Sequence, residues 1–431
     1  MGLNHGCKNV VGVTVMNHEM TGDRRFVRAE GPNRKIVSMR GRRGFDQLAA
    51  RWDHLISRVG QVRFFQHPDW YRALFDSRLV DPEEFLFVTV SDGPELVGLF
   101  PFRMDKWRTH GATINTMGLC NHPHMVLADS IIDDSRECPW LIPSLLRWLH
   151  EERPAAWDVL MLDKVPQRSA FYRSLSAEPA SRVVPAVTGA SGHVSTESED
   201  EAFGPVSGSF KRNLRRLAKR AEEAAPLRYE VYDAFPELDQ AFRIFLEVEA
   251  SGWKGACGIG TAIAQDPTLV TFYHELMQRF GARGQCMINH LIHGDKVVAS
   301  QFGLLVGGTY NILKIGYCEE QAWFAPGNLA MERTIRWCCA RPDIGELSFV
   351  TCPSWSHLWK PRQETVAGFR IFRPTVKGRL LRSGLRTKRW YDQWRKRKNP
   401  PEQGDGASPA AAAEEPGAAT APQNTTKAGK S

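Results

Sequence analysis

The sequence lacks most of the short motifs that identify an enzyme class directly. It has no P-loop, no His-Glu-x-x-His pair, no Gly-x-Ser-x-Gly elbow and no Cys-x-x-Cys pair. The usual signals of a Walker-type nucleotidase, a zinc protease, a serine hydrolase and a paired-cysteine metal or redox site are therefore missing. Its nine cysteines are an odd number, and Cys338 directly precedes Cys339, which argues against a disulfide framework.

Long apolar runs are missing as well. No stretch approaches the ~20 apolar residues of a membrane-spanning helix. Residues 10–16 are too short for the apolar region of a signal peptide. We therefore expect a cytoplasmic protein with free, mostly buried cysteines, with peripheral contact at the inner membrane face as an open alternative.

Basic charge is concentrated at the two ends of the 431-residue chain. The net charge is +8, but residues 377–398 hold ten basic residues and one acidic residue, residues 1–43 hold nine and three, and residues 44–376 sum to −5. An acidic body does not suggest a nucleic-acid partner. We predict a basic leader (1–43), an N-terminal module (44–200), a C-terminal module (201–376) and a basic aromatic helix (377–398). The Pro/Ala/Gly-rich tail (399–431) is expected to be disordered, because it cannot bury enough apolar surface to offset its ordering entropy.

The same order of secondary-structure elements is predicted twice. In each copy a helix comes first, followed by three strands, a second helix and a short apolar strand. The first copy comprises residues 68–79, 85–90, 95–102, 112–118, 139–152 and 157–163, and the second 267–280, 286–292, 296–306, 309–317, 327–340 and 346–350. This order predicts an α+β fold of two tandem modules, each with a mostly antiparallel central sheet flanked by helices. Chance likeness between two sets of common elements is the alternative.

Several local sequences resemble one enzyme family when taken in order. They are FFQHPDW (Phe64–Trp70), FKRNLRRLAKR (Phe210–Arg220), SGWKG (Ser251–Gly255), APGNL (Ala325–Leu329) and Lys360. Over residues 45 to 375 the chain resembles the GNAT acyl-CoA N-acyltransferases, in the tandem arrangement of Fem-type and CelD-like proteins. The resemblance implies acetyl-CoA as co-substrate, no metal, an amine or sugar acceptor, and a role in cell-envelope or exopolysaccharide biosynthesis.

A candidate cofactor site follows the strand over residues 309–317. Pro326 and Gly327 open a helix there, and the free N–H groups of a helix start attract anions. The resemblance implies that Ala325, Pro326, Gly327, Asn328 and Leu329 hold the coenzyme A pyrophosphate, although the loop reads QAWFAPGN and lacks the usual glycine pattern; an ordinary helix start is the alternative. The corresponding loop of the first copy, DDSRECPW, has acids and no glycine. We therefore expect only the second module to bind the cofactor.

Three side chains are candidates for the chemistry of acyl transfer. His357 could act as acid or base, because its ordinary pKa lies near neutrality. Lys360 could contact the acceptor or a phosphate, and Tyr317 could protonate the leaving thiolate. Surface or packing roles are the alternatives for all three.

Substrate contacts are expected from two further segments. Trp253 and Lys254 follow a predicted helix, where Trp253 would wall the acceptor pocket or close the core. Arg212 and Arg216 belong to an amphipathic basic helix over residues 210–221, which would bind an anionic acceptor or form a solvated face.

Other features carry weaker hypotheses. The crowded LCNHPH segment lacks a second ligand pair and does not indicate a metal site, and His290 and His293 are expected at exposed positions. The basic aromatic helix could lie on an anionic membrane, bind RNA or dock on the acidic body. Two alternative functions stay open: Fem-type aminoacyl transfer to a peptidoglycan precursor, and a non-catalytic membrane- or nucleic-acid-binding protein on the same scaffold.

Overall fold

The computed structural model describes residues 27–29, 33–109, 112–120, 122–152, 156–252, 254–255 and 260–384. The predicted disordered tail and most of the predicted basic aromatic helix lie outside these residues. No helix in the described part of the chain is long and apolar enough to cross a membrane.

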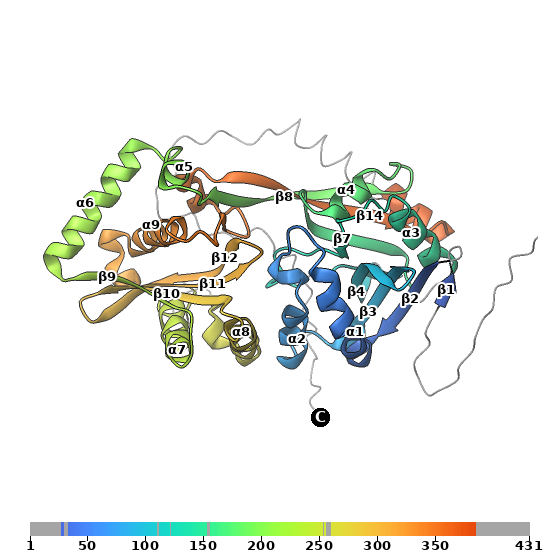
Figure 1. The fold of residues 1–431 in the computed structure, drawn as a ribbon, viewed down its shortest axis with the longest axis horizontal. Coiled ribbons are helices and arrows are strands. Elements are labelled where there is room, and N and C mark those ends of the chain that lie inside the picture. The colour runs from blue at the N-terminus through green and yellow to red at the C-terminus, as the bar shows by residue number, and fades with distance from the viewer. Residues whose placement is uncertain are drawn as a thin grey trace, which may run out of the picture.

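One 14-stranded sheet runs through both modules (Figure 1). The order of its strands is β1-β2-β3-β4-β5-β7-β14-β8-β13-β12-β11-β10-β9, with β6 paired to β4. The strands are β1 (Val27–Ala29), β2 (Arg34–Arg40), β3 (Phe85–Asp92), β4 (Glu95–Thr109), β5 (Ala112–Gly118), β6 (Ile131–Ile132), β7 (Val159–Pro166), β8 (Val184–Ser195), β9 (Leu227–Tyr232), β10 (Cys286–His293), β11 (Lys296–Val306), β12 (Thr309–Tyr317), β13 (Glu346–Ser348) and β14 (Arg362–Phe372).

The two modules exchange their last strands. β8 follows the first module along the chain, yet it pairs antiparallel with β13 of the second. β14 ends the second module, yet it pairs antiparallel with β7 of the first. β8 and β14 also pair with each other, from Arg362 opposite His193 to Arg370 opposite Val184. Each module therefore supplies the strand that completes the other's half of the sheet.

Helices cover both faces of the sheet. The helices are α1 (Gly41–Ile56), α2 (Pro68–Asp76), α3 (Leu141–Glu151), α4 (Ala170–Ser176), α5 (Glu199–Phe203), α6 (Gly208–Ala224), α7 (Glu237–Ala250), α8 (Pro267–Gly281) and α9 (Pro326–Cys339), with short 3-10 helices η1 (Phe64–Gln66), η2 (Pro82–Glu84), η3 (Ile263–Gln265), η4 (Glu319–Phe324) and η5 (Ser354–Trp359). α1, α2, α7 and α8 share one apolar core that spans both modules. On the opposite face, α3 and α4 cover the first module, and α5, α6 and α9 cover the second.

The predicted order of elements is confirmed in both copies. Similar local signals begin the first helix of each: Pro68 follows His67, whose side chain accepts from Asp69 N–H, and Pro267 follows Asp266, whose carboxylate accepts from Thr268 N–H. The sequence did not predict α1 or strand β2, which pairs with β1 and β3 and lies in the predicted leader. It also did not predict β8 or the strand exchange.

Candidate active site

β12 and β13 separate after a short parallel pairing. Thr309 to Asn311 of β12 pair with Glu346 to Ser348 of β13, where β13 ends. β12 continues to Tyr317 with only β11 as its sheet neighbour in this stretch. Residues 313–317 are half-buried, whereas β10 and β11 are buried along most of their length. We call this edge of β12, residues 312–317, the open edge.

α9 begins close to the end of the open edge. Ala325 caps it with a left-handed backbone (φ 52°), and Pro326 has no N–H to satisfy. The N–H groups of Asn328 and Leu329 donate to the Ala325 carbonyl, at 3.0 and 3.2 Å. Within the described chain, no carbonyl accepts from Gly327 N–H. A non-glycine residue in this conformation stores backbone strain, and the start of a helix favours an anion.

Tyr317 lies between the start of α9 and the end of α7. A Cβ on Gly327 would lie 3.5 Å from Tyr317 Cδ1, and one on Gly252 would lie 3.2 Å from the Tyr317 carbonyl oxygen. Burial raises the pKa of the half-buried Tyr317 phenol, so the group is protonated at neutral pH. The structure therefore brings the predicted proton donor to the predicted cofactor helix.

Lys254 lies at the open edge itself. Its Nζ donates to the Ile315 carbonyl at 3.2 Å and lies 3.4 Å from the Glu249 carboxylate. Glu249 is buried, and it accepts a hydrogen bond from Ile263 N–H at 2.9 Å. Sequence reasoning missed Glu249. An acid in the last turn of α7, where the helix dipole disfavours it, was the available signal.

Gly316 explains how close this pair comes to the strand. A Cβ on Gly316 would lie 2.5 Å from the Glu249 Cα, so α7 packs directly on the backbone of β12. Trp253, the other predicted acceptor residue of this segment, lies outside the described residues.

His357 and Lys360 lie on the exposed surface of η5. His357 Nε2 is 4.0 Å from Cys352 Sγ, and Lys360 ends η5 with a left-handed backbone (φ 51°). Trp359 between them is buried against Phe210 at the start of α6. Within the described residues, no hydrogen bond or ion pair joins His357 or Lys360 to Tyr317 or α9.

Arg212 and Arg216 project from the exposed face of α6, the predicted basic helix. Leu214, Leu217 and Ala221 form the buried face of this helix. Arg216 Nη2 donates to Asn213 Oδ1 at 2.9 Å. α6 contacts both η4 and α9, the elements that precede and form the predicted cofactor helix.

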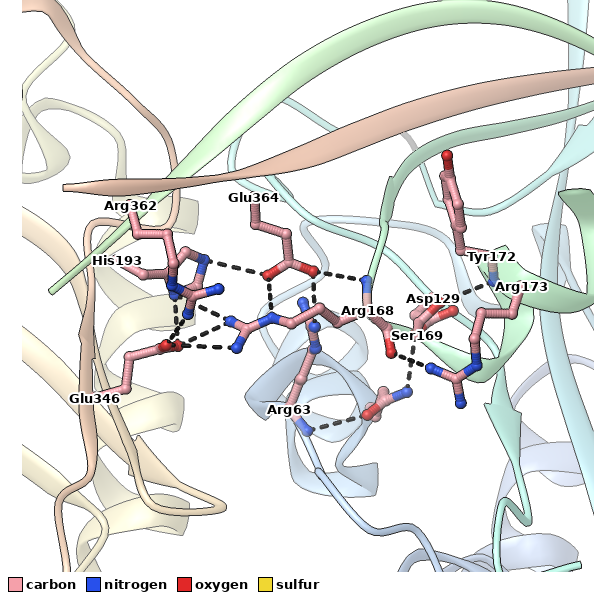
Figure 2. A network of polar contacts seen from close by, with 11 residues as sticks. Arg63, Asp129, Arg168, Ser169, Tyr172, Arg173, His193, Glu346, Arg362 and Glu364 are labelled. Carbon is pink, nitrogen blue, oxygen red and sulfur yellow. Dashed lines mark hydrogen bonds and ion pairs between the residues drawn. The ribbon is translucent and has the colours of Figure 1, made fainter. Parts of the chain in front are cut away.

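A charged network lies where the two modules meet (Figure 2). Glu364 of β14 accepts from Arg63 Nη2 and Arg168 Nε, both at 3.0 Å. Glu346 of β13 lies 2.9 Å from Arg168 Nη2 and 2.6 Å from His193 Nδ1. Burial alone would raise the Glu346 pKa, but hydrogen bonds from His193 and Arg168 lower it to about 2. We call these five residues the seam network.

Two small clefts flank the seam network. The first, about 310 Å³, is lined by Leu127, His193, Asn311 and Ser348 among others, and so reaches the point where β12 and β13 separate. The second, about 330 Å³, is lined by Gln66, Asp129, Ser130 and Ser169 among others. Burial raises the pKa of Asp129 to about 7, against the charge of Arg63.

A loop of the first module, residues 119–130, reaches the second module. His124 Nδ1 and the Tyr273 hydroxyl of α8 share a hydrogen bond of 3.1 Å. Burial first, and then the charge of Lys314 on β12, lower the His124 pKa to about 3, so its imidazole is neutral at pH 7. The sequence pattern around His124 suggests only a metal ligand, an interpretation that lacks a second ligand pair. The described residues contain no cluster of His, Cys, Asp and Glu suited to a metal ion.

One expected exposure was wrong. His290 is buried on β10, and its Nδ1 lies 2.9 Å from Ser300 Oγ of β11. It lies within the sheet, two strands from β12, and α7 packs against its strand. His293, at the end of β10, is half-buried.

Comparisons with known proteins agree with this geometry. Residues 208–354 match the family described as "Acetyltransferase (GNAT) domain". No curated protein matches the chain. Among solved structures, FemX resembles it with a TM-score of 0.53 at 9% identity, over 75% of this chain and 96% of FemX.

Two more solved structures are similar at lower scores. L-PGS from Bacillus licheniformis aligns with a TM-score of 0.45 at 12% identity, over 78% of this chain and 96% of its own. A tandem GNAT protein from the clavulanic acid biosynthesis pathway aligns with 0.42 at 10% identity, over 79% and 99%. The GNAT match thus lies within the second module, and the chain as a whole shares its fold with FemX.

Proposed function

We propose that the chain is an acyl-CoA-dependent N-acyltransferase whose second module transfers an acetyl group to an amine or sugar acceptor. The observation that carries the proposal is the open edge of β12, which leads through η4 into the strained start of α9. Acyl transfer needs a groove for an extended thioester arm and an anion site at its end, and this arrangement supplies both. The family match over residues 208–354 supports the same reaction class.

The cofactor would lie along the open edge, with its pyrophosphate at Ala325–Leu329. Gly327 N–H is the donor available there, and Gly327 leaves the approach unobstructed. Unpaired backbone groups of β12 would polarise the thioester carbonyl. Tyr317, protonated because of its burial, would donate a proton to the departing thiolate. Arg212 and Arg216 on the adjoining α6 would attract the phosphates of an anionic substrate.

The acceptor would approach through the cleft that ends at Asn311 and Ser348. Both modules line this cleft, since Leu127 comes from the loop of the first module. His124 on that loop is neutral at pH 7 and would accept a hydrogen bond from the acceptor, while its pKa of about 3 makes it too weak a base to take a proton from an amine. Lys254 would orient the acceptor beside Ile315. His357 and Lys360, exposed on η5, would serve at the rim of the site.

Binding of acetyl-CoA tests the proposal most directly. Isothermal titration of the full chain should detect acetyl-CoA binding, and Gly327→Trp should weaken it more than about tenfold by filling the start of α9. Gly345→Trp is the matched control, because a Cβ at this exposed glycine would meet nothing within 4 Å. Absence of binding to the unchanged protein would contradict the proposal. Equal loss in both variants would contradict the assigned location.

Fem-type aminoacyl transfer is the second candidate, and the fold shared with FemX favours it. Among the described residues no helix exceeds the 17 residues of α6, so no long helical arm extends from the second module. Transfer of a labelled amino acid from aminoacyl-tRNA, with no response to acetyl-CoA in the titration, would select this candidate. The CelD-like association with exopolysaccharide biosynthesis is part of the first proposal, and sugar acceptors in the acetyl-transfer assay test it.

A further inference from the structure

Large apolar side chains are exposed at six positions of the described residues, and three belong to neighbouring elements. Val376 is 76% exposed, Leu380 68% and Trp107 52%. Val376 and Leu380 lie one turn apart on the helical residues 376–384 that follow β14. Trp107 lies near the end of β4. Burial of such side chains is favourable, so three together at one end indicate a contact surface.

Two basic side chains fix the orientation of this helix. Lys377 Nζ donates to the Thr113 carbonyl and to Asp158 Oδ2, both at 2.6 Å. Arg382 donates to the carbonyls of Ser181 and Ala180, at 2.6 and 3.1 Å. Because Lys377 and Arg382 bind the body of the protein, Val376 and Leu380 are left on the outward side. Their high exposure is therefore a property of an anchored helix.

Trp107 belongs to the hairpin that this helix contacts. Thr113, which accepts the hydrogen bond from Lys377, is the cross-strand partner of Arg108. Trp107 directly precedes Arg108 and pairs with Ile114. The β4–β5 hairpin and the start of the helix therefore adjoin at Thr113, and we call their exposed apolar side chains, Trp107, Val376 and Leu380, the Trp107–Leu380 surface.

The charges around this surface are mostly basic. Lys106, Arg108 and Arg379 are exposed, and Asp105 is the exposed acid on the same strand. Asp158 is already paired with Lys377. Exposed apolar side chains surrounded by Lys and Arg suit the boundary between headgroups and acyl chains in an anionic bilayer.

We propose that the Trp107–Leu380 surface docks the protein on an anionic lipid bilayer. The sequence that follows this surface also favours a bilayer. Residues 385–398 contain Leu385, Trp390, Tyr391 and Trp394 with seven basic residues and one acid. A nucleic acid would match the cations but not the exposed Val376 and Leu380. The proposal does not depend on the acyltransferase activity.

Vesicle binding of the full chain tests this surface. The protein should co-sediment with vesicles of equal parts phosphatidylglycerol and phosphatidylcholine, and not with phosphatidylcholine alone. Leu380→Ser should weaken that binding about tenfold by removing one inserting side chain. Leu358→Ser is the matched control, a leucine 43% exposed on η5, and should leave vesicle binding unchanged. Arg379→Glu should also weaken vesicle binding, and this loss should be larger at low salt than at high salt, because salt screens the attraction.

Three results would overturn the proposal. The first is that the unchanged protein does not bind anionic vesicles, whether or not it binds RNA. The second is equal binding to neutral and anionic vesicles. The third is unchanged binding in Leu380→Ser combined with loss in a Trp390→Ala/Trp394→Ala variant, which would assign the contact to residues beyond 384. Circular dichroism of each variant checks that its fold is intact.

Discussion

The two modules differ at the parallel pair that follows their hairpins. In the second module, β12 pairs with β13 at its first residues and then continues alone for the length of the open edge. In the first module, β5 pairs with β7 at its last residues, from Thr116 opposite Val159 to Gly118 opposite Met161. β5 ends there, so it has no open edge. The same order of elements therefore gives a groove in one module and a closed sheet in the other.

The loop after β5 occupies the space that the open edge leaves free in the second module. Leu119 N–H donates to the Met161 carbonyl at 3.2 Å, and Ala128 N–H donates to the Lys164 carbonyl at 3.1 Å. Lys164 Nζ in turn donates to the His122 and Met125 carbonyls, at 3.3 and 2.8 Å. In the first module, the loop after β5 therefore makes hydrogen bonds to the backbone of β7. In the second module, the open edge of β12 is left for an extended ligand.

The helix starts differ in the same sense. The residues before α3 include Asp133, which pairs with Arg58, and Asp134, which accepts from Gly60 N–H. These acids would repel a pyrophosphate. Neither α3 nor α9 has an acid in its first turn, and α9 is distinguished by the left-handed Ala325 followed by Pro326. Under the proposed function both the open edge and the helix start are needed, and the second module combines them.

The largest expected effect comes from breaking the seam network, which joins the two modules. Glu364→Gln keeps the shape of a buried side chain but leaves Arg63, Arg168 and His193 without its charge. Breaking a buried ion pair costs about 4 kcal/mol, so the free energy of unfolding in urea should fall by that order. Glu223→Gln, in an exposed pair with Lys219, should cost less than ~0.5 kcal/mol. Equal effects of the two variants would contradict the seam's role.

The second expected effect distinguishes Gly118 from Gly316, two glycines that allow a neighbouring backbone to pack directly on their strands. A Cβ on Gly118 would lie 1.8 Å from the Met161 carbonyl oxygen, and one on Gly316 would lie 2.5 Å from the Glu249 Cα. Each Gly→Ala should destabilise the protein by about 3 kcal/mol through overpacking. In the folded fraction, Gly316→Ala should also weaken acetyl-CoA binding in the titration, because it moves α7 and Lys254. Gly118→Ala should not, and equal binding losses would contradict the asymmetry of the modules.

The fold was predicted where its signals are local. Both repeats, the turn residues and the proline starts of α2, α8 and α9 depend on neighbours in sequence. The exchange of β8 and β14 was missed because a strand's partner is set by distant residues, and β8 has no local sign of pairing with β13. In the site, Tyr317, Gly327 and Lys254 were each named from the sequence and lie near one another, while Glu249 and His124 needed three-dimensional contacts to be noticed. Gly316, alone within a strand, was a readable sign of close backbone approach.

A third and smaller effect concerns the closed edge of the first module. Lys164→Met removes two hydrogen bonds from a half-buried ammonium to loop carbonyls, and should lower the free energy of unfolding by about 1–2 kcal/mol. Hydrogen exchange of residues 119–130 should accelerate, while exchange along β12 stays unchanged. Faster exchange along β12 as well would mean that the loop supports the open edge, and would weaken the view that the modules differ independently.

The smallest effect is a pH dependence that arises at the seam. Burial opposes the charge of His193, but its hydrogen bond to Glu346 and its ion pair with Glu364 at 3.3 Å outweigh burial and raise its pKa above 6.5. A raised pKa gives stability that is full below the unfolded value and is lost as the pH rises through the folded value. For Glu346, lowered to about 2, stability is present above the unfolded value of 4.5 and is lost as the pH falls toward 2. The contribution of the seam network to the free energy of unfolding should therefore be largest between about pH 4.5 and 6.5.

This window can be isolated with one substitution. His193→Gln removes the titrating group, so the difference in unfolding free energy between it and the unchanged protein should be largest near pH 6 and shrink toward pH 9. The buried Asp129, with its pKa near 7, titrates in the same range but is present in both proteins, so its contribution cancels. A difference that grows with pH would mean that His193 is neutral in the folded state. The carboxylates of Glu346 and Glu364 would then be balanced by Arg63 and Arg168 alone, and the two modules would be joined by arginine without a titratable contact.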